Sequence, residues 1–211
     1  MAVIFALIGC DSGGFDEDPI VCFGDSLTEG YGGGGIGQID RSRSYPAYLQ
    51  KKVSLPVVNA GISGDTTVDA LARLETDVLS KNPQMVIIFF GANDFFQQRP
   101  AAQTKFNLQT IINRTRSGER KIFLVSFLGD LEWEANLLNS PAGMIFTQHG
   151  ALLSQYRIMF NELAEENNDI NFIPNIWAGV WGIHMTDPVH PSAAGYELIA
   201  ETIYEAIRLH L

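Results

Sequence analysis

Short apolar runs alternate with longer amphipathic stretches along most of the chain. Four runs have the length and composition of strands buried on both faces of a sheet: 20–23 (IVCF), 56–59 (PVVN), 85–90 (MVIIFF) and 122–127 (IFLVSF). The segment 170–174 (INFIP) predicts a fifth strand. Because helical patterns separate these runs, they indicate strands of a parallel sheet.

Between the predicted strands, apolar residues recur with the period of a helix. We predict helices over 44–53, 66–82, 106–118, 151–167 and 191–210. In the second helix, the apolar stripe would be formed by Val68, Leu71, Leu74 and Val78. The alternation of strand and helix predicts an α/β fold: a single doubly wound, flavodoxin-like domain with about five parallel strands and helices on both faces.

The domain is predicted to span residues 19–211, because no linker composition follows residue 18. Within it, the segment 128–147 has no clear period and contains several apolar residues, among them Trp133. Long apolar loops often cover a binding site, so this segment is a candidate lid or substrate wall.

Residues 1–18 differ in composition from the rest of the chain. A short apolar run ends in LIGC, in which the cysteine is Cys10, and a Gly/Ser/Asp-rich stretch follows. LIGC resembles the lipobox of bacterial lipoprotein signals, which implies export to the periplasm or membrane anchoring through a lipid on Cys10. The alternative is an extra edge strand or a frayed terminus, which would leave the protein in the cytoplasm.

The composition of the 211 residues is that of an ordinary globular domain, with 46% hydrophobic and 18% charged residues. Asp and Glu number 24 against 14 Lys and Arg, which gives a formal net charge of −10. A surface this acidic repels phosphate backbones, so no nucleic-acid partner is expected. No apolar run reaches the ~18 residues of a membrane-spanning helix.

Small and polar residues follow the apolar runs at the points where the strands would end. Asp25 and Ser26 follow the first run, Gly64 follows the second and Asn93 follows the third. Ligands of open parallel sheets bind outside the carboxyl ends of the strands, so we expect these residues to share one rim. Ser26 alone could be a helix N-cap, and as a nucleophile it would need a base.

The four histidines are the candidate bases: His149, His184, His190 and His210. His190 is favoured because Asp187 precedes it by three residues. At this spacing the carboxylate can accept the Nδ1 proton of the ring and leave Nε2 facing Ser26. The alternative reading of this DPVHP segment is a proline-rich turn.

A nucleophile that attacks a carbonyl also needs donors for the developing oxyanion. The main-chain N–H of Ser26 is one candidate, Gly64 permits close approach of a second, and the side-chain amide of Asn93 is a third. Each of these loops could instead be an ordinary glycine or asparagine turn. We predict no cofactor and no metal, since Asp187 and His190 have no third ligand at metal spacing.

FGDSLTEGYG, NAGISGDTT, GANDF and DPVHP, in this order, resemble the four blocks of the SGNH (GDSL) hydrolases. The similarity is closest to the bacterial thioesterase I, lysophospholipase L1 and arylesterase group, and it covers nearly all of the chain after the N-terminal segment. It implies a Ser26–His190–Asp187 triad, with Gly64 and Asn93 in the oxyanion hole. It also implies a serine esterase that works through an acyl-enzyme intermediate.

The expected substrate is a small-molecule or lipid ester: a short-chain acyl or aryl ester, a lysophospholipid or an acyl thioester. The residues expected to line its site are Asp25, Leu27, Phe95, Phe96, Trp133 and Met185. Two alternatives stay open. One is a carbohydrate O-deacetylase of the same superfamily, and the other is a non-catalytic flavodoxin-like binding module, which would not require the triad residues to meet.

Overall fold

Five parallel strands form the central sheet of the protein. The computed structural model describes residues 18–129, 146 and 149–211. The strands are β1 (Ile20–Gly24), β2 (Val57–Gly61), β3 (Met85–Phe89), β4 (Lys121–Val125) and β5 (Asn171–Ile173). They pair in the order β2-β1-β3-β4-β5, which is the flavodoxin-like order. All five predicted strands and the predicted fold class are confirmed.

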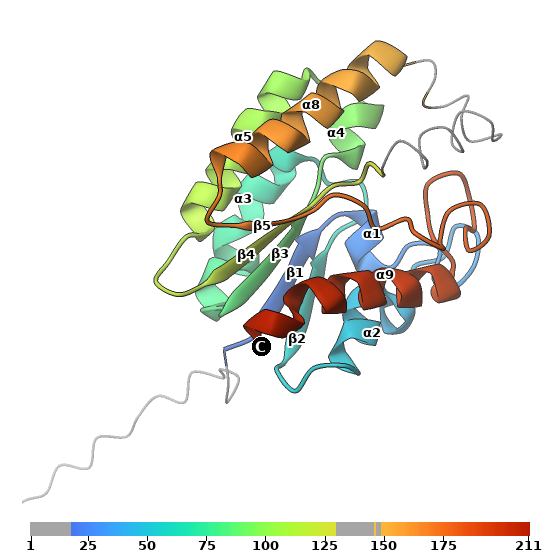
Figure 1. The fold of residues 1–211 in the computed structure, drawn as a ribbon. Coiled ribbons are helices and arrows are strands. Elements are labelled where there is room, and N and C mark those ends of the chain that lie inside the picture. Colours follow the sequence, from blue (N-terminus) through green and yellow to red (C-terminus); the bar gives the residue numbers. More distant parts are fainter. Residues whose placement is uncertain (1–17, 130–145, 147–148) are drawn as a thin grey trace, which may run out of the picture.

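Helices cover both faces of this sheet (Figure 1). The α-helices of the described residues are α1 (Ser26–Glu29), α2 (Tyr45–Gln50), α3 (Thr67–Asp77), α4 (Ala92–Phe96), α5 (Ala101–Thr115), α8 (Gly150–Glu166) and α9 (Ala193–Ile207). Helices α2 and α9 pack together on one face, while α3, α5 and α8 pack in a row on the other. Short 3₁₀ turns lie at Arg41–Arg43, Leu79–Lys81 and Arg208–His210.

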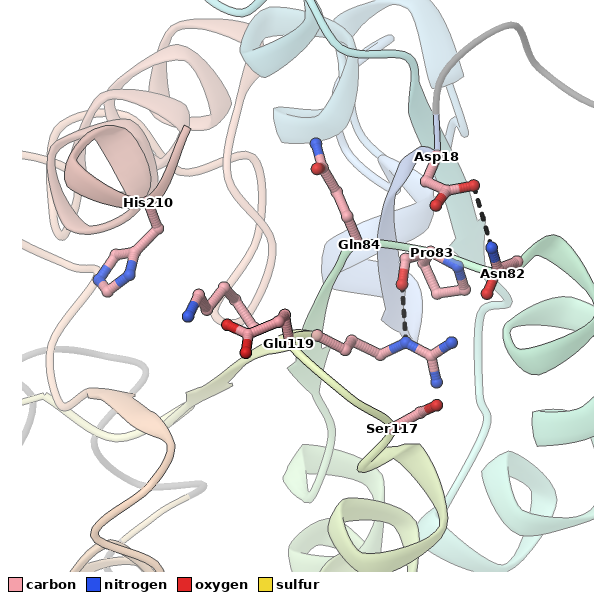
Figure 2. A pocket seen from close by; sticks show the side chains of 9 residues that line it. Asp18, Asn82, Pro83, Gln84, Ser117, Glu119 and His210 are labelled. Atoms are coloured by element: carbon pink, nitrogen blue, oxygen red, sulfur yellow. Dashed lines mark hydrogen bonds between the residues drawn. The ribbon is translucent and has the colours of Figure 1, made fainter.

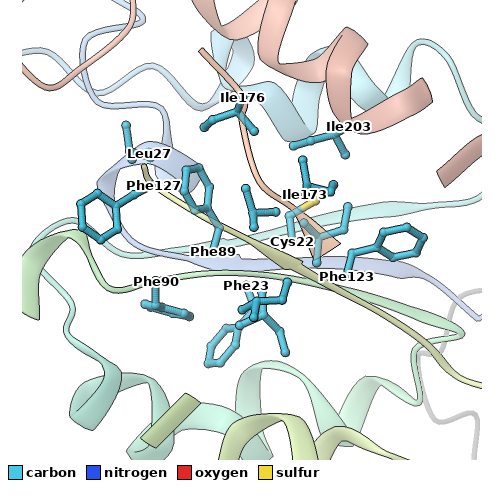
Figure 3. Close-up of a cluster of buried hydrophobic side chains, with 14 of the residues drawn as sticks. Cys22, Phe23, Leu27, Phe89, Phe90, Phe123, Phe127, Ile173, Ile176 and Ile203 are labelled. Carbon is cyan, nitrogen blue, oxygen red and sulfur yellow. The ribbon is translucent and has the colours of Figure 1, made fainter. Parts of the chain in front are cut away.

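The core lies on both sides of the two central strands, β1 and β3, in which every residue is buried. Successive side chains of a strand point to opposite faces. Figure 3 shows Phe23 and Phe90 on one side of the sheet and Cys22 and Phe89 on the other. Burial on both faces explains why these strands are continuous apolar runs in the sequence.

Helix α3 differs from the prediction in two respects: which residues it buries and where it ends. Val68 is 46% exposed, so its place in the apolar stripe was wrong. The helix instead buries Thr67, Ala70 and Leu74, whose spacing of three and four residues follows one side of a helix. Helix α3 ends at Asp77 and not near residue 82, and a 3₁₀ turn follows.

Two predictions concern residues outside the described part of the chain. The signal segment with Cys10 falls in residues 1–17, and most of the candidate lid, with Trp133, falls in 130–145. Both stay predictions, as does the boundary of the domain at residue 19. Among the described helices, none has the length and apolar character needed to cross a membrane.

Candidate active site

The carboxyl ends of β1, β2 and β3 lie level with one another. Gly24 at the end of β1 is paired with Gly61 of β2 and with Phe89 of β3. The loops that follow these three strands therefore begin at the same rim of the sheet, as expected for a ligand site in a fold of this kind.

Ser26 is the first residue of α1, directly after β1. The helix N-cap is Asp25, whose side chain accepts a hydrogen bond from the main-chain N–H of Leu27 at 3.0 Å. Because Asp25 caps the helix, the Ser26 hydroxyl is not needed to accept a hydrogen bond from the first turn of α1. The turn requires glycine at position 24, because a Cβ there would lie 2.0 Å from Oγ1 of Thr28.

The hydroxyl of Ser26 meets the ring of His190, although 164 residues separate them in the chain. Ser26 Oγ lies 3.0 Å from His190 Nε2. On the other side of the ring, Nδ1 lies 2.8 Å from Oδ2 and 3.0 Å from Oδ1 of Asp187. The structure therefore brings the three predicted residues into one connected hydrogen-bonded chain.

Local hydrogen bonds prepare Asp187 for this arrangement. Partial burial alone would raise the pKa of this carboxyl group. The main-chain N–H groups of Val189 and His190 each donate to Oδ1 at 2.8 Å, and with the His190 ring they lower the pKa of Asp187 below its ordinary value. An ionised Asp187 accepts a hydrogen bond from Nδ1–H, which leaves Nε2 without a proton and free to accept that of Ser26.

The glycine-rich loop after Ser26 packs against His190, a contact that the sequence analysis missed. The ring centroid of Tyr31 lies 4.4 Å from that of His190. The hydroxyl of Tyr196 donates a 2.7 Å hydrogen bond to the main-chain oxygen of Tyr31. Gly32 has a φ of +89°, and a Cβ there would lie 3.1 Å from Cβ of His190. This loop therefore restricts the movement of the imidazole.

The three expected oxyanion donors belong to loops that are bonded to one another. Asn93 Nδ2 donates to the main-chain oxygen of Asp65 at 2.9 Å and lies 3.4 Å from Oδ2 of Asp25. These partners are the chain neighbours of Gly64 and Ser26. Among the described residues, neither the N–H of Ser26 nor that of Gly64 donates to another group. Gly64 has a φ of +87° with open space beside it.

Asp25 differs from Asp187 in its electrostatics. Its side chain is buried, and loss of hydration raises the pKa of Asp25 to about 7. The nearby carboxyl groups of Asp94 and Asp65 act in the same direction, whereas the hydrogen bond from the N–H of Leu27 opposes them. With only 1% of its surface exposed, Asp25 offers little area to a substrate.

An apolar pocket adjoins the catalytic segments. Three of its lining residues, Leu27, Ala92 and Val189, directly neighbour Ser26, Asn93 and His190 in the chain. The remaining lining residues are Phe96, Phe127, Phe146, Trp177 and Trp181. Its accessible volume is about 10 Å³, roughly the space of one water molecule, so an apolar substituent would meet these side chains at the surface of a shallow hollow.

The expected substrate contacts fall into several groups in the structure. Leu27 and Phe96 line this pocket, whereas Phe95 does not. Phe95 is fully buried and packs among aromatic rings, including that of Tyr156, so it supports the core. Met185 pairs with Pro191 in a β-bridge, and Trp133 lies outside the described residues.

Several lining residues were missed, namely Ala92, Phe127, Phe146 and Val189. The sequence carried a signal for two of them, because Ala92 and Val189 are chain neighbours of Asn93 and His190.

A second cavity, of about 340 Å³, lies at the opposite, amino-terminal edge of the sheet (Figure 2). Its lining mixes acidic and basic residues, and several of them bond to one another: Asn82 donates to Asp18 at 3.1 Å, and Arg120 donates to the main-chain oxygen of Pro83 at 2.7 Å. His210 belongs to this cavity and lies far along the sheet from Ser26. Within the described ranges, no group of three or more His, Cys, Asp or Glu residues is placed to hold a metal ion.

Known proteins resemble this chain in sequence and in fold. A model of the GDSL-like lipase/acylhydrolase family matches residues 22–198. Esterase TesA of Pseudomonas aeruginosa is 25% identical over 194 residues, which cover 90% of this chain and 87% of that protein. The thioesterase 1/protease 1/lysophospholipase L1 of Escherichia coli K12 is 32% identical over 110 residues, or 51% of this chain and 50% of that protein. A crystal structure of TesA matches with a TM-score of 0.71 at 25% identity, covering 92% of this chain and 100% of the other.

Proposed function

Because this chain belongs to the GDSL-like lipase/acylhydrolase family, we propose that it is a serine esterase that hydrolyses carboxylic esters with an apolar acyl group. The observation that carries the proposal is the 3.0 Å contact between Ser26 Oγ and His190 Nε2 beside an apolar pocket. A binding module would not need these two side chains, which lie 164 residues apart, to meet.

In the first half of the reaction, Ser26 Oγ attacks the ester carbonyl carbon while His190 Nε2 takes the hydroxyl proton. The carbonyl oxygen becomes an oxyanion, which in this proposal the N–H groups of Ser26 and Gly64 and the amide of Asn93 stabilise. Losing one such donor typically costs about 3 kcal/mol of transition-state stabilisation. The tetrahedral intermediate then breaks its bond to the alcohol oxygen, which receives the proton from His190.

In the second half, water repeats the same steps on the acyl-enzyme. His190 takes a proton from the water as its oxygen attacks the acyl carbon, and the bond to Ser26 Oγ breaks. The proton returns to Ser26 Oγ, and the carboxylic acid leaves. Asp187 stabilises the imidazolium that forms in both halves, which its lowered pKa and its hydrogen bonds favour.

The pocket lining supports an apolar acyl group over a small polar one. Its residues are aliphatic and aromatic, and three of them adjoin the catalytic residues in the chain. Each methylene group that such a pocket buries contributes about 0.8 kcal/mol, or about a fourfold gain in rate at low substrate concentration. A carbohydrate deacetylase would gain nothing from a longer acyl chain.

A series of p-nitrophenyl esters from acetate to octanoate tests this proposal. We expect kcat/KM to rise by up to about fifteenfold from acetate to butyrate, because two more methylene groups contact the apolar side chains around the hollow. Ser26→Ala should lower kcat by at least about 10⁴-fold, because it removes the nucleophile. Ser80→Ala is the matched control, since Ser80 is an exposed serine in the 3₁₀ turn after α3.

Two results would contradict the proposal. If Ser26→Ala kept a tenth of the wild-type turnover, the assignment of the nucleophile would be wrong. If acetate were the best substrate and acetylated xylan oligosaccharides were cleaved faster than any p-nitrophenyl ester, the enzyme would be a carbohydrate deacetylase.

A further inference from the structure

Arg73, on α3, binds several parts of the active-site rim with one guanidinium group. Its Nε donates to Oδ2 of Asp65 at 2.6 Å. Its Nη1 donates to the main-chain oxygen of Ala60 at 2.8 Å and to Asp77 at 3.0 Å. Its Nη2 donates to the main-chain oxygen of Gly24 at 2.8 Å. A single side chain thus joins the carboxyl ends of β1 and β2 to the loop after β2.

These partners stand next to the oxyanion donors. Gly24 is two residues before Ser26, and Asp65 directly follows Gly64. The main-chain oxygen of Asp65 accepts the hydrogen bond from Asn93 at 2.9 Å. Through these contacts Arg73 is connected to the three groups that the oxyanion requires.

The shape of the guanidinium group matters as much as its charge. The Cζ atom of Arg73 lies 4.6 Å from the ring centroid of Phe23 and 5.7 Å from that of Phe90. The Arg73 side chain is only 13% exposed. A planar group with donors in a fixed fork suits this position, whereas a lysine has one ammonium centre and cannot reach all of these acceptors.

The same loop is held independently from its other side. The carboxylate of Glu29 accepts hydrogen bonds from the main-chain N–H of Ser63 at 2.8 Å and from its hydroxyl at 2.6 Å. Glu29 is in turn paired with Arg41. Because Glu29 retains the loop, loss of Arg73 should displace Asp65 without releasing the whole segment.

We propose that Arg73 is a positioning residue of the oxyanion hole. Through Asp65 it places the amide of Asn93 relative to Ser26. The inference rests on the proposed esterase function. Oxyanion donors act over 2.7–3.1 Å, so a small displacement of Asn93 weakens transition-state stabilisation more than substrate binding.

Arg73→Lys tests this role, with Arg116→Lys as the matched control. Two nitrogens of Arg116 also donate to one carboxylate, that of Asp169, each at 2.8 Å. Arg116 follows α5, however, and lies at the amino-terminal edge of the sheet, away from Ser26. We expect Arg73→Lys to lower kcat for p-nitrophenyl butyrate about tenfold with KM changed less than twofold. Arg116→Lys should leave both constants unchanged. Titration with diethyl p-nitrophenyl phosphate counts the folded active sites.

A double-mutant cycle with Asn93→Ala separates positioning from a merely structural role. If Arg73 acts through Asn93, Arg73→Lys should change kcat less than twofold in the Asn93→Ala background. Asp65→Asn gives a second variant should Arg73→Lys fold poorly, because it keeps the main-chain acceptor and removes the charged partner. Like Arg73→Lys, Asp65→Asn should lower kcat in the wild-type background and change it less than twofold in the Asn93→Ala background.

The inference is overturned if both Arg73→Lys and Asp65→Asn keep kcat within twofold of wild type. It is also overturned if either loss of kcat persists in full in the Asn93→Ala background. These outcomes differ from failure of the esterase proposal, which would appear as turnover that survives Ser26→Ala.

Discussion

Asp25 directly precedes Ser26 in the chain and Asp187 binds the ring of His190, and their surroundings move their pKa values in opposite directions. Burial raises the pKa of Asp25 to about 7. Hydrogen bonds from Val189 and His190 outweigh partial burial at Asp187 and lower its pKa. Near neutral pH, Asp187 is therefore ready to hold an imidazolium, whereas Asp25 is poised between its two protonation states.

The raised pKa of Asp25 predicts how Asp25→Asn changes the stability of the protein with pH. Between an unfolded value of 3.8 and a folded value of about 7, the folded state keeps a proton that the unfolded state has released. The stabilisation from neutral Asp25 is thus complete below pH 3.8 and is lost as pH rises through about 7. Asn cannot ionise, so the unfolding free energy of the variant relative to wild type should increase by up to about 1 kcal/mol per pH unit from pH 5 to 7.

Urea unfolding at several pH values measures this difference. Asp169→Asn is the control: Arg116 lowers the pKa of Asp169, so this carboxylate is ionised in both states over the same range. The free energy of unfolding of Asp169→Asn relative to wild type should not change between pH 5 and 7. If the free energy of unfolding of Asp25→Asn relative to wild type were also independent of pH, Asp25 would ionise normally in the folded protein.

At the scale of elements, the start of α3 connects the stability of that helix to the loop after β2, which carries Gly64 and Asp65. Thr66 is the N-cap, and its main-chain N–H and hydroxyl donate to Asp69 at 2.9 and 2.6 Å in a capping box. Thr66 directly follows Asp65, which binds Arg73 and Asn93. The cap therefore fixes where the helix begins and where the loop ends.

Thr66→Ala should lower the unfolding free energy by about 1 kcal/mol, because it removes the capping side chain. Since Arg73 still holds Asp65, kcat should fall less than threefold. Urea unfolding and ester hydrolysis measure the two effects. Thr202→Ala in the exposed part of α9, where the hydroxyl bonds only to the main-chain oxygen of Leu198, should not destabilise the protein. Equal losses of stability in both variants would contradict the capping role.

At the scale of the whole molecule, the active site exists only while the complete fold persists. Ser26 follows the first strand, whereas His190 precedes the last helix, α9, which packs on α2. In Figure 1, α1, which begins at Ser26, and α9, which follows His190, lie near each other on one side of the sheet. Loss of tertiary structure therefore separates Ser26 from His190.

We predict a single unfolding transition, in which esterase activity and far-ultraviolet circular dichroism are lost at the same urea concentration. This result would also support the prediction that residues 19–211 form one domain. If activity disappeared at a clearly lower urea concentration, the segment that carries His190 would open as a separate unit. Intrinsic tryptophan fluorescence, followed in the same titration, reports on the three tryptophans, of which Trp177 and Trp181 line the pocket.

Much of the fold and part of the site followed from the sequence alone. The strands were predictable because burial on both faces of a parallel sheet demands short continuous apolar runs, a local property of the chain. Ser26, Asp187 and His190 were identified as candidates because the serine follows a strand end and the other two stand three residues apart. Their meeting in space agrees with that prediction, and their catalytic roles await the experiments above.

Only the tertiary structure decided which side chains face the substrate and which hold the site together. Phe95 and Phe96 are adjacent in the chain, yet Phe95 is buried in the core and Phe96 lines the pocket. The sequence could not distinguish them, because α4 has only five residues and shows no helical period of apolar positions. Arg73 looks like a surface residue of an amphipathic helix, and its partners come from two strand ends and a loop. Such contacts join segments distant in the chain, and the pKa of Asp25 likewise depends on burial that no local pattern reveals.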